Sequence, residues 1–399
     1  MEINVKGYHM KRHMKVGIKL NKVINKSYYY IGSILMNLIK IFVKTDDKLI
    51  LFVSFGGKQY NDSPKAIYEA MINDSRFKDY NIVWAFKEPN KVNMPGRALK
   101  VKIDSIKYFL ITLKARIWVS NAPIERRLNY KGKKTFYFCT WHGTPIKKIG
   151  KEVSSSSPII YEKSKYDVIT AQGEFDVEIF SKSFNIEKES IVRTGLPRND
   201  VLANSPENQV INIKRKLNIS CDKKVILYCP TYRDWQGNNM DINIDFNKWY
   251  KKLGDDYIVL LRTHAKVSNT ILKTDIPDDF LYDLSQYDEL NDLMLISDLL
   301  ITDYSSLVID YSILEKPILC YTYDFEKYQN ERGMYFDIRD YLLGGSITED
   351  ELLNLIKNFS ISESIERVKE LKSKFVQYYG NASRQSLDII YETLQDNKF

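Results

Sequence analysis

Four apolar runs in this sequence end in side chains that can bind an anion or move a proton. The runs FYFCTW, VILYC, YIVLL and LLI end, in that order, in His142-Gly143-Thr144, Pro230-Thr231-Tyr232-Arg233, Arg262-Thr263-His264 and Thr302-Asp303-Tyr304-Ser305-Ser306. Each ending supplies a hydrogen-bond donor or a base. One such ending would be weak support for a functional site, but four of them favour one shared site.

The segment TDYSS suits an anionic group. Ser305 and Ser306 stand where the run LLIT turns into the helical pattern SLVIDYSILEK, and a helix N-terminus offers free N–H groups to a phosphate. Asp310 follows Ser306 by four residues, which places both on one helix face, where the carboxylate can accept from a ligand hydroxyl. The alternative is that one of the serines only caps the helix.

Arginine and histidine side chains add further candidate phosphate ligands. Arg262 suits a bidentate phosphate contact, and His264 can donate to phosphate oxygens or protonate a leaving group. Residues two apart on an extended strand point to one side, so we expect these two side chains to act together. Arg198, in the turn LPRND, is another candidate. The alternatives are a histidine satisfied in a domain interface and an arginine in a surface salt bridge.

The elements that must position these side chains alternate between short apolar runs and helical stretches from residue 49 onward. Such alternation predicts an α/β fold in which helices cover both faces of a parallel sheet. The cycle restarts after TGLPRNDVL, which predicts two Rossmann-like domains, residues 46–200 and 201–375, facing a central cleft. Residues 376–399 are expected to form a helix that packs back on these domains. Ser63 is expected to cap the helix SPKAIYEAMIND.

Composition limits the class of protein. The 399 residues are 44% hydrophobic and 28% charged, which is typical of a globular chain long enough for two domains. The balance of 59 Lys and Arg against 51 Asp and Glu gives +8 and favours an anionic partner. The basic residues are dispersed, histidines are few and no CxxC spacing occurs. These features argue against a nucleic-acid binder and against a zinc site.

Residues 1–45 differ from the rest of the chain. Six basic residues between Lys11 and Lys26 precede the apolar stretch YYYIGSILMNLIKIFVK. The stretch is shorter than the roughly 20 apolar residues of a spanning helix, and no small-residue cleavage site marks it as a signal peptide. A basic, aromatic-rich amphipathic segment can lie in the interface of an anionic leaflet, so we predict peripheral membrane association. The alternative is a helix packed on the protein's own core.

Several segments, taken in order, resemble the CDP-glycerol glycerophosphotransferases, the teichoic acid primases and polymerases of Gram-positive bacteria. They are SFGGKQYNDSPKAIYEAM, TWHGTPIKKIG, TGLPRND, YCPTYRD, LLRTH, ISDLLITDYSSLVIDYSILEKP and YTYDFEKYQNERGMYFD. The resemblance covers roughly residues 50–340. It implies a GT-B fold at the cytoplasmic face of the cell membrane. It also implies transfer of glycerol phosphate from CDP-glycerol to a hydroxyl of a lipid-linked acceptor.

The resemblance also implies which residues form the site. His142 and His264 are the candidate catalytic residues. The candidate substrate-binding residues are Trp141, Gly143, Thr144, Pro145, Arg198, Pro230, Thr231, Arg262, Thr263, Ser305, Ser306 and Asp310. In this scheme His142 is the general base for the acceptor hydroxyl, which attacks the β-phosphorus as CMP leaves. Basic groups and a helix end neutralise the pyrophosphate, so we predict neither a metal nor another cofactor.

Alternatives stay open at this point. Ribitol enzymes share these motifs, so CDP-ribitol is the alternative donor, and the fold alone also suits a sugar-transferring GT-B enzyme. A catalytically dead, membrane-bound scaffold is the non-enzymatic alternative, and the presence of both His142 and His264 argues against it. The sequence does not choose between primase and polymerase or between wall teichoic acid and capsule, and it does not fix the acceptor or the oligomeric state.

Overall fold

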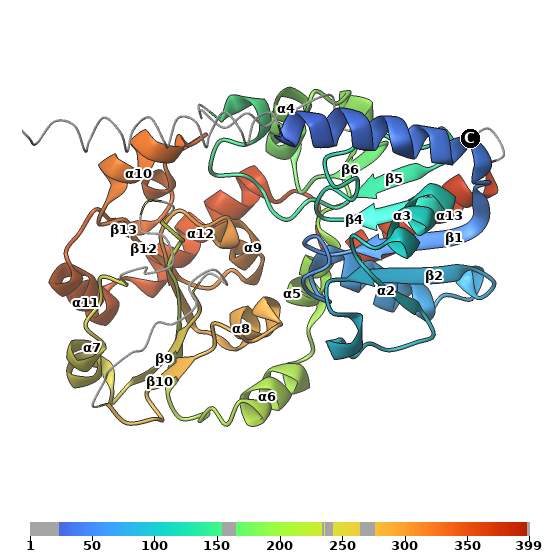
Figure 1. The fold of residues 1–399 in the computed structure, drawn as a ribbon. Helices are drawn as coiled ribbons and strands as arrows, with labels where there is room; N and C mark the ends of the chain where they lie inside the picture. Colours follow the sequence, from blue (N-terminus) through green and yellow to red (C-terminus); the bar gives the residue numbers. More distant parts are fainter. Residues whose placement is uncertain (1–23, 154–164, 234, 236–241, 264–275, 397–399) are drawn as a thin grey trace, which may run out of the picture.

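The computed structural model describes residues 24–153, 165–233, 235, 242–263 and 276–396. They form two α/β halves, each built on one parallel sheet (Figure 1). The predicted α/β fold with two parallel sheets is therefore confirmed.

The sheet of the first half has seven parallel strands. Their order across the sheet is β3 (Leu99–Lys102), β2 (Asn81–Phe86), β1 (Asp46–Val53), β4 (Ala115–Ser120), β5 (Phe136–Cys139), β6 (Val168–Thr170) and β7 (Ile191–Val192). The inner strands are apolar and buried on both faces because helices cover both sides. These helices are α2 (Asp62–Ile72), α3 (Ile106–Lys114), α4 (Glu174–Phe184), α13 (Ala382–Gln395) and an N-terminal helix of residues 24–42.

The sheet of the second half repeats this plan with six parallel strands. Their order is β10 (Leu281–Asp283), β9 (Tyr257–Leu261), β8 (Lys224–Cys229), β11 (Leu299–Thr302), β12 (Ile318–Tyr321) and β13 (Leu343–Gly345). The helices of this half are α5 (Asp200–Asn204), α6 (Glu207–Lys216), α7 (Phe246–Leu253), α8 (Leu290–Ile296), α9 (Leu307–Tyr311), α10 (Phe325–Arg332), α11 (Glu349–Asn358) and α12 (Ile361–Phe375).

Each sheet has a point where the strand order reverses, and this point locates the site. In the first sheet the reversal falls between β1 and β4, whose carboxyl ends lead into Ser54 and Asn121. In the second sheet it falls between β8 and β11, whose carboxyl ends lead into Pro230 and Asp303. Ligands of open parallel sheets bind outside the strand ends at such reversals. The topology therefore brings three of the four polar endings, those after β8, β9 and β11, to a single edge of the second sheet.

The C-terminal helix returns to the first half. Leu387 and Ile390 of α13 are buried against Phe52 and other residues of the first sheet. Just before this helix, the backbone N–H groups of Gln377 and Tyr378 donate to the carbonyl of Gln172 at 2.8 and 3.0 Å. The chain thus crosses twice between the halves.

The N-terminal helix, drawn in blue in Figure 1, packs with one side and exposes the other. Met36 is buried in the first core, Ser33 Oγ accepts from the Asn129 N–H at 2.8 Å, and Asn37 Nδ2 donates to the Asn129 carbonyl at 2.8 Å. The exposed apolar and aromatic residues of this helix are Ile24, Tyr28, Tyr30, Ile31, Ile34, Leu35, Leu38, Ile41 and Phe42. Within the described ranges, no helix combines the length and the apolar character needed to cross a bilayer.

Candidate active site

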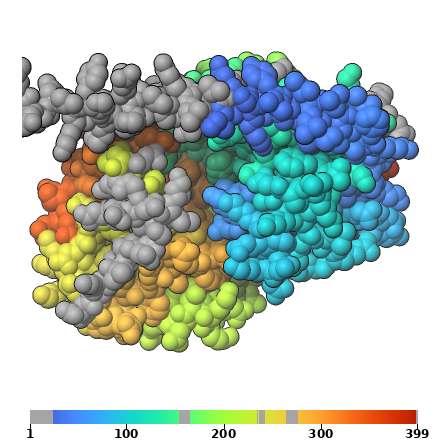
Figure 2. Space-filling view, in the orientation of Figure 1, coloured from blue at the N-terminus to red at the C-terminus, as the bar shows by residue number. Residues whose placement is uncertain are grey.

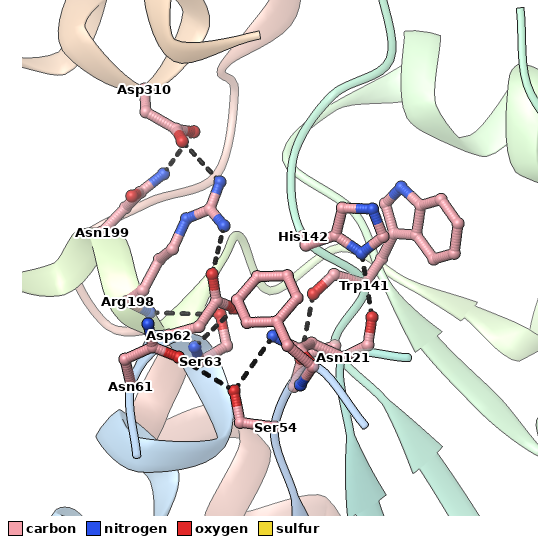
Figure 3. Close-up of polar contacts among 12 residues, drawn as sticks. Ser54, Asn61, Asp62, Ser63, Asn121, Trp141, His142, Arg198, Asn199 and Asp310 are labelled. Atoms are coloured by element: carbon pink, nitrogen blue, oxygen red, sulfur yellow. Dashed lines mark hydrogen bonds and ion pairs between the residues drawn. The ribbon is translucent and has the colours of Figure 1, made fainter. Parts of the chain in front are cut away.

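His142 lies on the turn that follows β5, and its ring is held in one orientation. His142 Nδ1 is 2.9 Å from the backbone carbonyl of Asn121 (Figure 3). A carbonyl can only accept, so Nδ1 carries the proton and Nε2 keeps a lone pair. The imidazole also stacks on Trp141, with ring centroids 4.1 Å apart, and packs against Phe55. This arrangement leaves Nε2 as the basic atom of the ring.

The surroundings of His142 keep the imidazole neutral. Burial lowers the pKa of His142 below its usual value, the hydrogen bond to Asn121 and the carboxylate of Asp62 raise the pKa, and the Arg198 guanidinium lowers it. The net direction is downward. At neutral pH the ring is therefore in the form that can accept a proton.

The residues after Gly143 anchor the turn. Thr144 and Pro145 are buried, and Thr144 Oγ1 donates to Asp176 Oδ2 at 3.1 Å while accepting from Gln172 Nε2 at 3.2 Å. Burial raises the pKa of Asp176 to about 7. The predicted substrate contacts of Thr144 and Pro145 stay predictions, and in this structure both residues support the turn from inside.

Arg198 lies between carboxylates from the two halves. Its Nη1 donates to Asp62 Oδ2 of α2 and its Nη2 donates to Asp310 Oδ2 of α9, each at 2.5 Å (Figure 3). Charge-assisted bonds of this length are strong, and the guanidinium side chain is only 14% exposed. The structure thus pairs Arg198 with two carboxylates, and its predicted contact with a donor phosphate stays a prediction.

The carboxylate of Asp310 accepts from three protein donors. Besides Arg198, Asn199 Nδ2 donates to Asp310 Oδ1 at 2.7 Å and Gln172 Nε2 donates to the same oxygen at 3.2 Å. The predicted role of accepting from a ligand hydroxyl stays a prediction. What the structure shows is that Asp310 fastens α9 of the second half to the turn residues of the first half.

The expectation that Ser63 caps α2 is wrong. The helix begins at Asp62 and its N-cap is Asn61, which makes no side-chain capping bond. Ser63 Oγ instead accepts from the backbone N–H of Arg198 at 3.3 Å. The start of α2 is thus shaped by contacts with the LPRND turn, a partner 135 positions away.

Ser306 meets the His142 turn across the boundary between the halves. A Cβ placed on Gly143 would lie 3.2 Å from Arg198 Nη2 and 3.2 Å from Ser306 Oγ. Ser306 is the N-cap of α9 but makes no side-chain capping bond, whereas Ser305 Oγ accepts from the Leu307 N–H at 3.3 Å. The structure therefore places Arg198 and Ser306 so close to Gly143 that an added side-chain carbon would crowd both. In Figure 2 the surface is recessed between the blue-to-cyan first half and the yellow-to-orange second half.

A buried arginine ties together three strand ends of the second sheet. Arg233 is fully buried, and its guanidinium pairs with Asp303 after β11 at 2.8 Å and with Asp324 after β12 at 2.8 Å. The Thr231 N–H donates to both oxygens of Asp303, at 2.9 and 3.1 Å. Pro230 and Thr231 are thereby held beside the TDYSS loop. The residues predicted to bind the donor substrate after β8 and after β11 are thus linked to each other through Asp303.

Arg262 and Thr263 follow the end of β9. Arg262 Nη1 donates to the carbonyls of Leu284 and Ser285 at 2.7 Å each, and Thr263 Oγ1 bonds to Ser285 Oγ at 2.8 Å. Both residues thus fix the loop after β10, and their contacts with donor stay predictions. His264 lies outside the described residues.

No group of three or more His, Cys, Asp or Glu side chains is placed to hold a metal within the part of the chain that the structure describes. Metal independence stays a prediction.

Residues 35–392 match the family model of CDP-glycerol:poly(glycerophosphate) glycerophosphotransferases. The chain belongs to this family. The family resemblance of the sequence motifs, and with it the predicted class of enzyme, is confirmed.

Relatives of this chain differ in length. It is 34% identical over 400 residues to the teichoic acid glycerol-phosphate transferase of Staphylococcus aureus, covering 94% of this chain and 99% of that protein. It is 38% identical over 374 residues to the teichoic acid poly(glycerol phosphate) polymerase of Staphylococcus epidermidis, covering 88% of this chain but 51% of that protein. The chain thus spans about half the length of that polymerase. The solved structure of the wall teichoic acid polymerase TagF matches with a TM-score of 0.83 at 33% identity, and each chain is covered completely.

Sequence reasoning missed three residues of the His142 site. They are Asp62, Asn121 and Gln172, which bind Arg198, His142 and Asp310, respectively. Asp62 lies in SFGGKQYNDSPKAIYEAM, a segment that carried the resemblance, so attention to its acidic residue would have found it. Asn121 acts on His142 through a backbone carbonyl, for which a side-chain motif gives no signal.

Proposed function

We propose that the chain transfers glycerol phosphate from CDP-glycerol to a hydroxyl of an acceptor, with CMP as the leaving group. Membership of the family supports this, as does the nearly full-length match to a glycerol-phosphate transferase. One of the solved TagF structures is a variant soaked with CDPG, which supports the same donor here. For these reasons we propose CDP-glycerol rather than CDP-ribitol as the donor.

One observation carries the mechanism, namely the orientation of His142. Because Nδ1 donates to the Asn121 carbonyl, Nε2 is the atom that takes the proton from the acceptor hydroxyl. The acceptor oxygen forms a bond to the β-phosphorus of CDP-glycerol, and the bond from that phosphorus to the CMP oxygen breaks. The proton goes to Nε2 and the electron pair leaves with CMP, so the step balances. A positioned base of this kind contributes on the order of 10²–10⁴-fold to the rate.

Donor binding falls to the strand ends of the second half. Ser305, Ser306, Arg262 and His264 supply hydroxyls and cationic groups for the pyrophosphate, and Arg233 holds the strand ends of β8, β11 and β12 together. Phosphoryl transfer depends mainly on positioning and on neutralising charge, which these groups provide in our scheme. The acceptor then approaches from the side of the first half, where His142 lies.

We also propose that the N-terminal helix holds the enzyme at the cytoplasmic face of the membrane, close to a lipid-linked acceptor. The support is its exposed side, on which Ile31, Leu38 and Phe42 are 67%, 54% and 87% exposed. An amphipathic helix with such a side can lie in the headgroup region. Its inner side packs on the protein through Met36 and Asn37, so deleting the helix would also damage the fold. Substitution of exposed residues is the sharper test.

A donor screen tests the proposed activity. The purified protein is incubated with CDP-glycerol, CDP-ribitol or UDP-sugars and a lipid-linked acceptor analogue, and the release of CMP or UDP is measured with and without EDTA. We expect CMP release from CDP-glycerol that depends on acceptor and survives EDTA. If the protein instead releases more CMP from CDP-ribitol, or UDP from a UDP-sugar, then glycerol phosphate is not the group that it transfers.

A further inference from the structure

Asp62 has a backbone conformation that is unusual for its residue type. Its φ is +62°, in the left-handed region, which costs energy for a residue with a side chain and persists where the surroundings impose it. The side chain is 7% exposed. Oδ1 accepts from the Ser63 N–H at 2.7 Å and Oδ2 accepts from Arg198 Nη1 at 2.5 Å. A strained, buried carboxylate beside a candidate base is typical of a functional site.

The contacts of Asp62 extend across the boundary between the halves. Arg198 joins Asp62 on α2 to Asp310 on α9 (Figure 3), and its Nη2 would lie 3.2 Å from a Cβ placed on Gly143. Removal of one partner from a buried ion pair is costly because it leaves a buried charge uncompensated. Arg198 can therefore keep its place beside the His142 turn only while a carboxylate holds each end of its guanidinium.

We propose that Asp62 is a positioning residue of this enzyme, which fixes Arg198 between the two halves and so sets the place of the His142 turn. Asp62 does not act on the reacting atoms itself. The catalytic part of this inference rests on the proposed function, in which His142 is the base.

The charge of Asp62 gives it a second effect on the same turn. Asp62 and Arg198 are the charged groups that act on His142, and they act in opposite directions, Asp62 raising its pKa and Arg198 lowering it. The remaining ring neighbours, Phe55 and Trp141, are uncharged. When His142 takes up a proton it becomes an imidazolium, which a nearby carboxylate stabilises. Loss of the Asp62 charge should therefore make His142 a weaker base.

The test compares Asp62→Asn with two matched variants. Asparagine tolerates left-handed backbone, so this change removes the charge and keeps the conformation. Asp310→Asn removes the other partner of Arg198. Asp74→Asn is the control at the far end of α2, where a carboxylate with 10% side-chain exposure pairs with Arg76. The chain has four histidines, so NMR of histidine-labelled protein can follow His142, assigned by comparison with His142→Gln.

We expect two results for Asp62→Asn. The His142 titration midpoint moves to lower pH, and kcat with CDP-glycerol falls on the order of 10²-fold, the cost of a displacement of about 1 Å. Asp310→Asn should lower kcat with a smaller change in midpoint, and Asp74→Asn should match the wild type in both. An unchanged midpoint together with an unchanged kcat in folded Asp62→Asn would overturn the proposal.

A second variant covers the case in which Asp62→Asn does not fold. Asp62→Glu keeps the charge and moves the carboxylate by one methylene, so it should retain the wild-type midpoint and lose kcat. Wild-type kcat in this variant would overturn the positioning role. The NMR midpoint needs no substrate, so a protein that transfers nothing from any donor would refute the proposed function while the effect of Asp62 on His142 is still measured.

Discussion

Replacement of Gly143 by alanine tests whether the shape of the turn sets the position of His142. Gly143 has a φ of +132°, outside the regions that a side chain permits, and holding a residue in such a conformation costs on the order of 1–3 kcal/mol. The new Cβ would also lie 3.2 Å from Arg198 Nη2 and from Ser306 Oγ, inside the optimal separation of about 3.5–4.0 Å. Both effects push the turn away from Arg198 and Ser306, and His142 moves with it.

We expect kcat of Gly143→Ala to fall on the order of 10²-fold, the cost of misplacing a catalytic group by about 1 Å. CMP release gives kcat, calorimetry gives the affinity for CDP-glycerol, and circular dichroism checks the fold. Gly132→Ala is the matched control, because a Cβ at Gly132 meets no atom closer than 3.4 Å. A folded Gly143→Ala enzyme with the kcat of the wild type would refute the coupling between the turn and His142.

Four further predictions concern the base, the donor and the membrane. His142→Ala should lower kcat on the order of 10²–10⁴-fold with CDP-glycerol affinity retained, and normal turnover of the folded variant would rule out His142 as the base. Because burial lowers the pKa of His142, the wild-type kcat/KM should hold as pH falls to the usual histidine value of about 6.5 and drop only where the ring protonates. A pH–rate profile with its acid limb above that value would contradict the neutral base. Arg262→Ala should weaken CDP-glycerol binding by about 1–3 kcal/mol in calorimetry, and an unchanged affinity would remove Arg262 from the donor site. Glutamate at both Leu38 and Phe42 should reduce sedimentation with anionic liposomes, and rising salt should release the wild type. Glutamate at Ile106, an exposed apolar residue on α3, is the control, and equal binding by the paired variant would place the anchor elsewhere.

The sequence was informative wherever the signal is local. Alternation of apolar runs with helical periods needs only a few residues at a time, and it predicted two parallel sheets with polar strand ends. The order of the motifs predicted the family, which the match over residues 35–392 confirms. The helix SPKAIYEAMIND was also predicted, but its cap was misassigned because Ser63 serves the distant Arg198 turn.

The sequence by itself determined the sheets, the polar strand ends, His142 and the presence of Arg198 and Asp310. Other features were decided by tertiary structure alone. Only the packing of the two halves decided that Arg198 meets Asp62 and Asp310, which are 136 and 112 positions away. A local pattern specifies which residue types follow a strand, but the partner of a buried charge is chosen by desolvation, which depends on everything that packs around it. The orientation of His142 could not be predicted from the sequence for a similar reason. Its partner is the backbone carbonyl of Asn121, and every residue carries such a carbonyl, so only proximity in space selects this one.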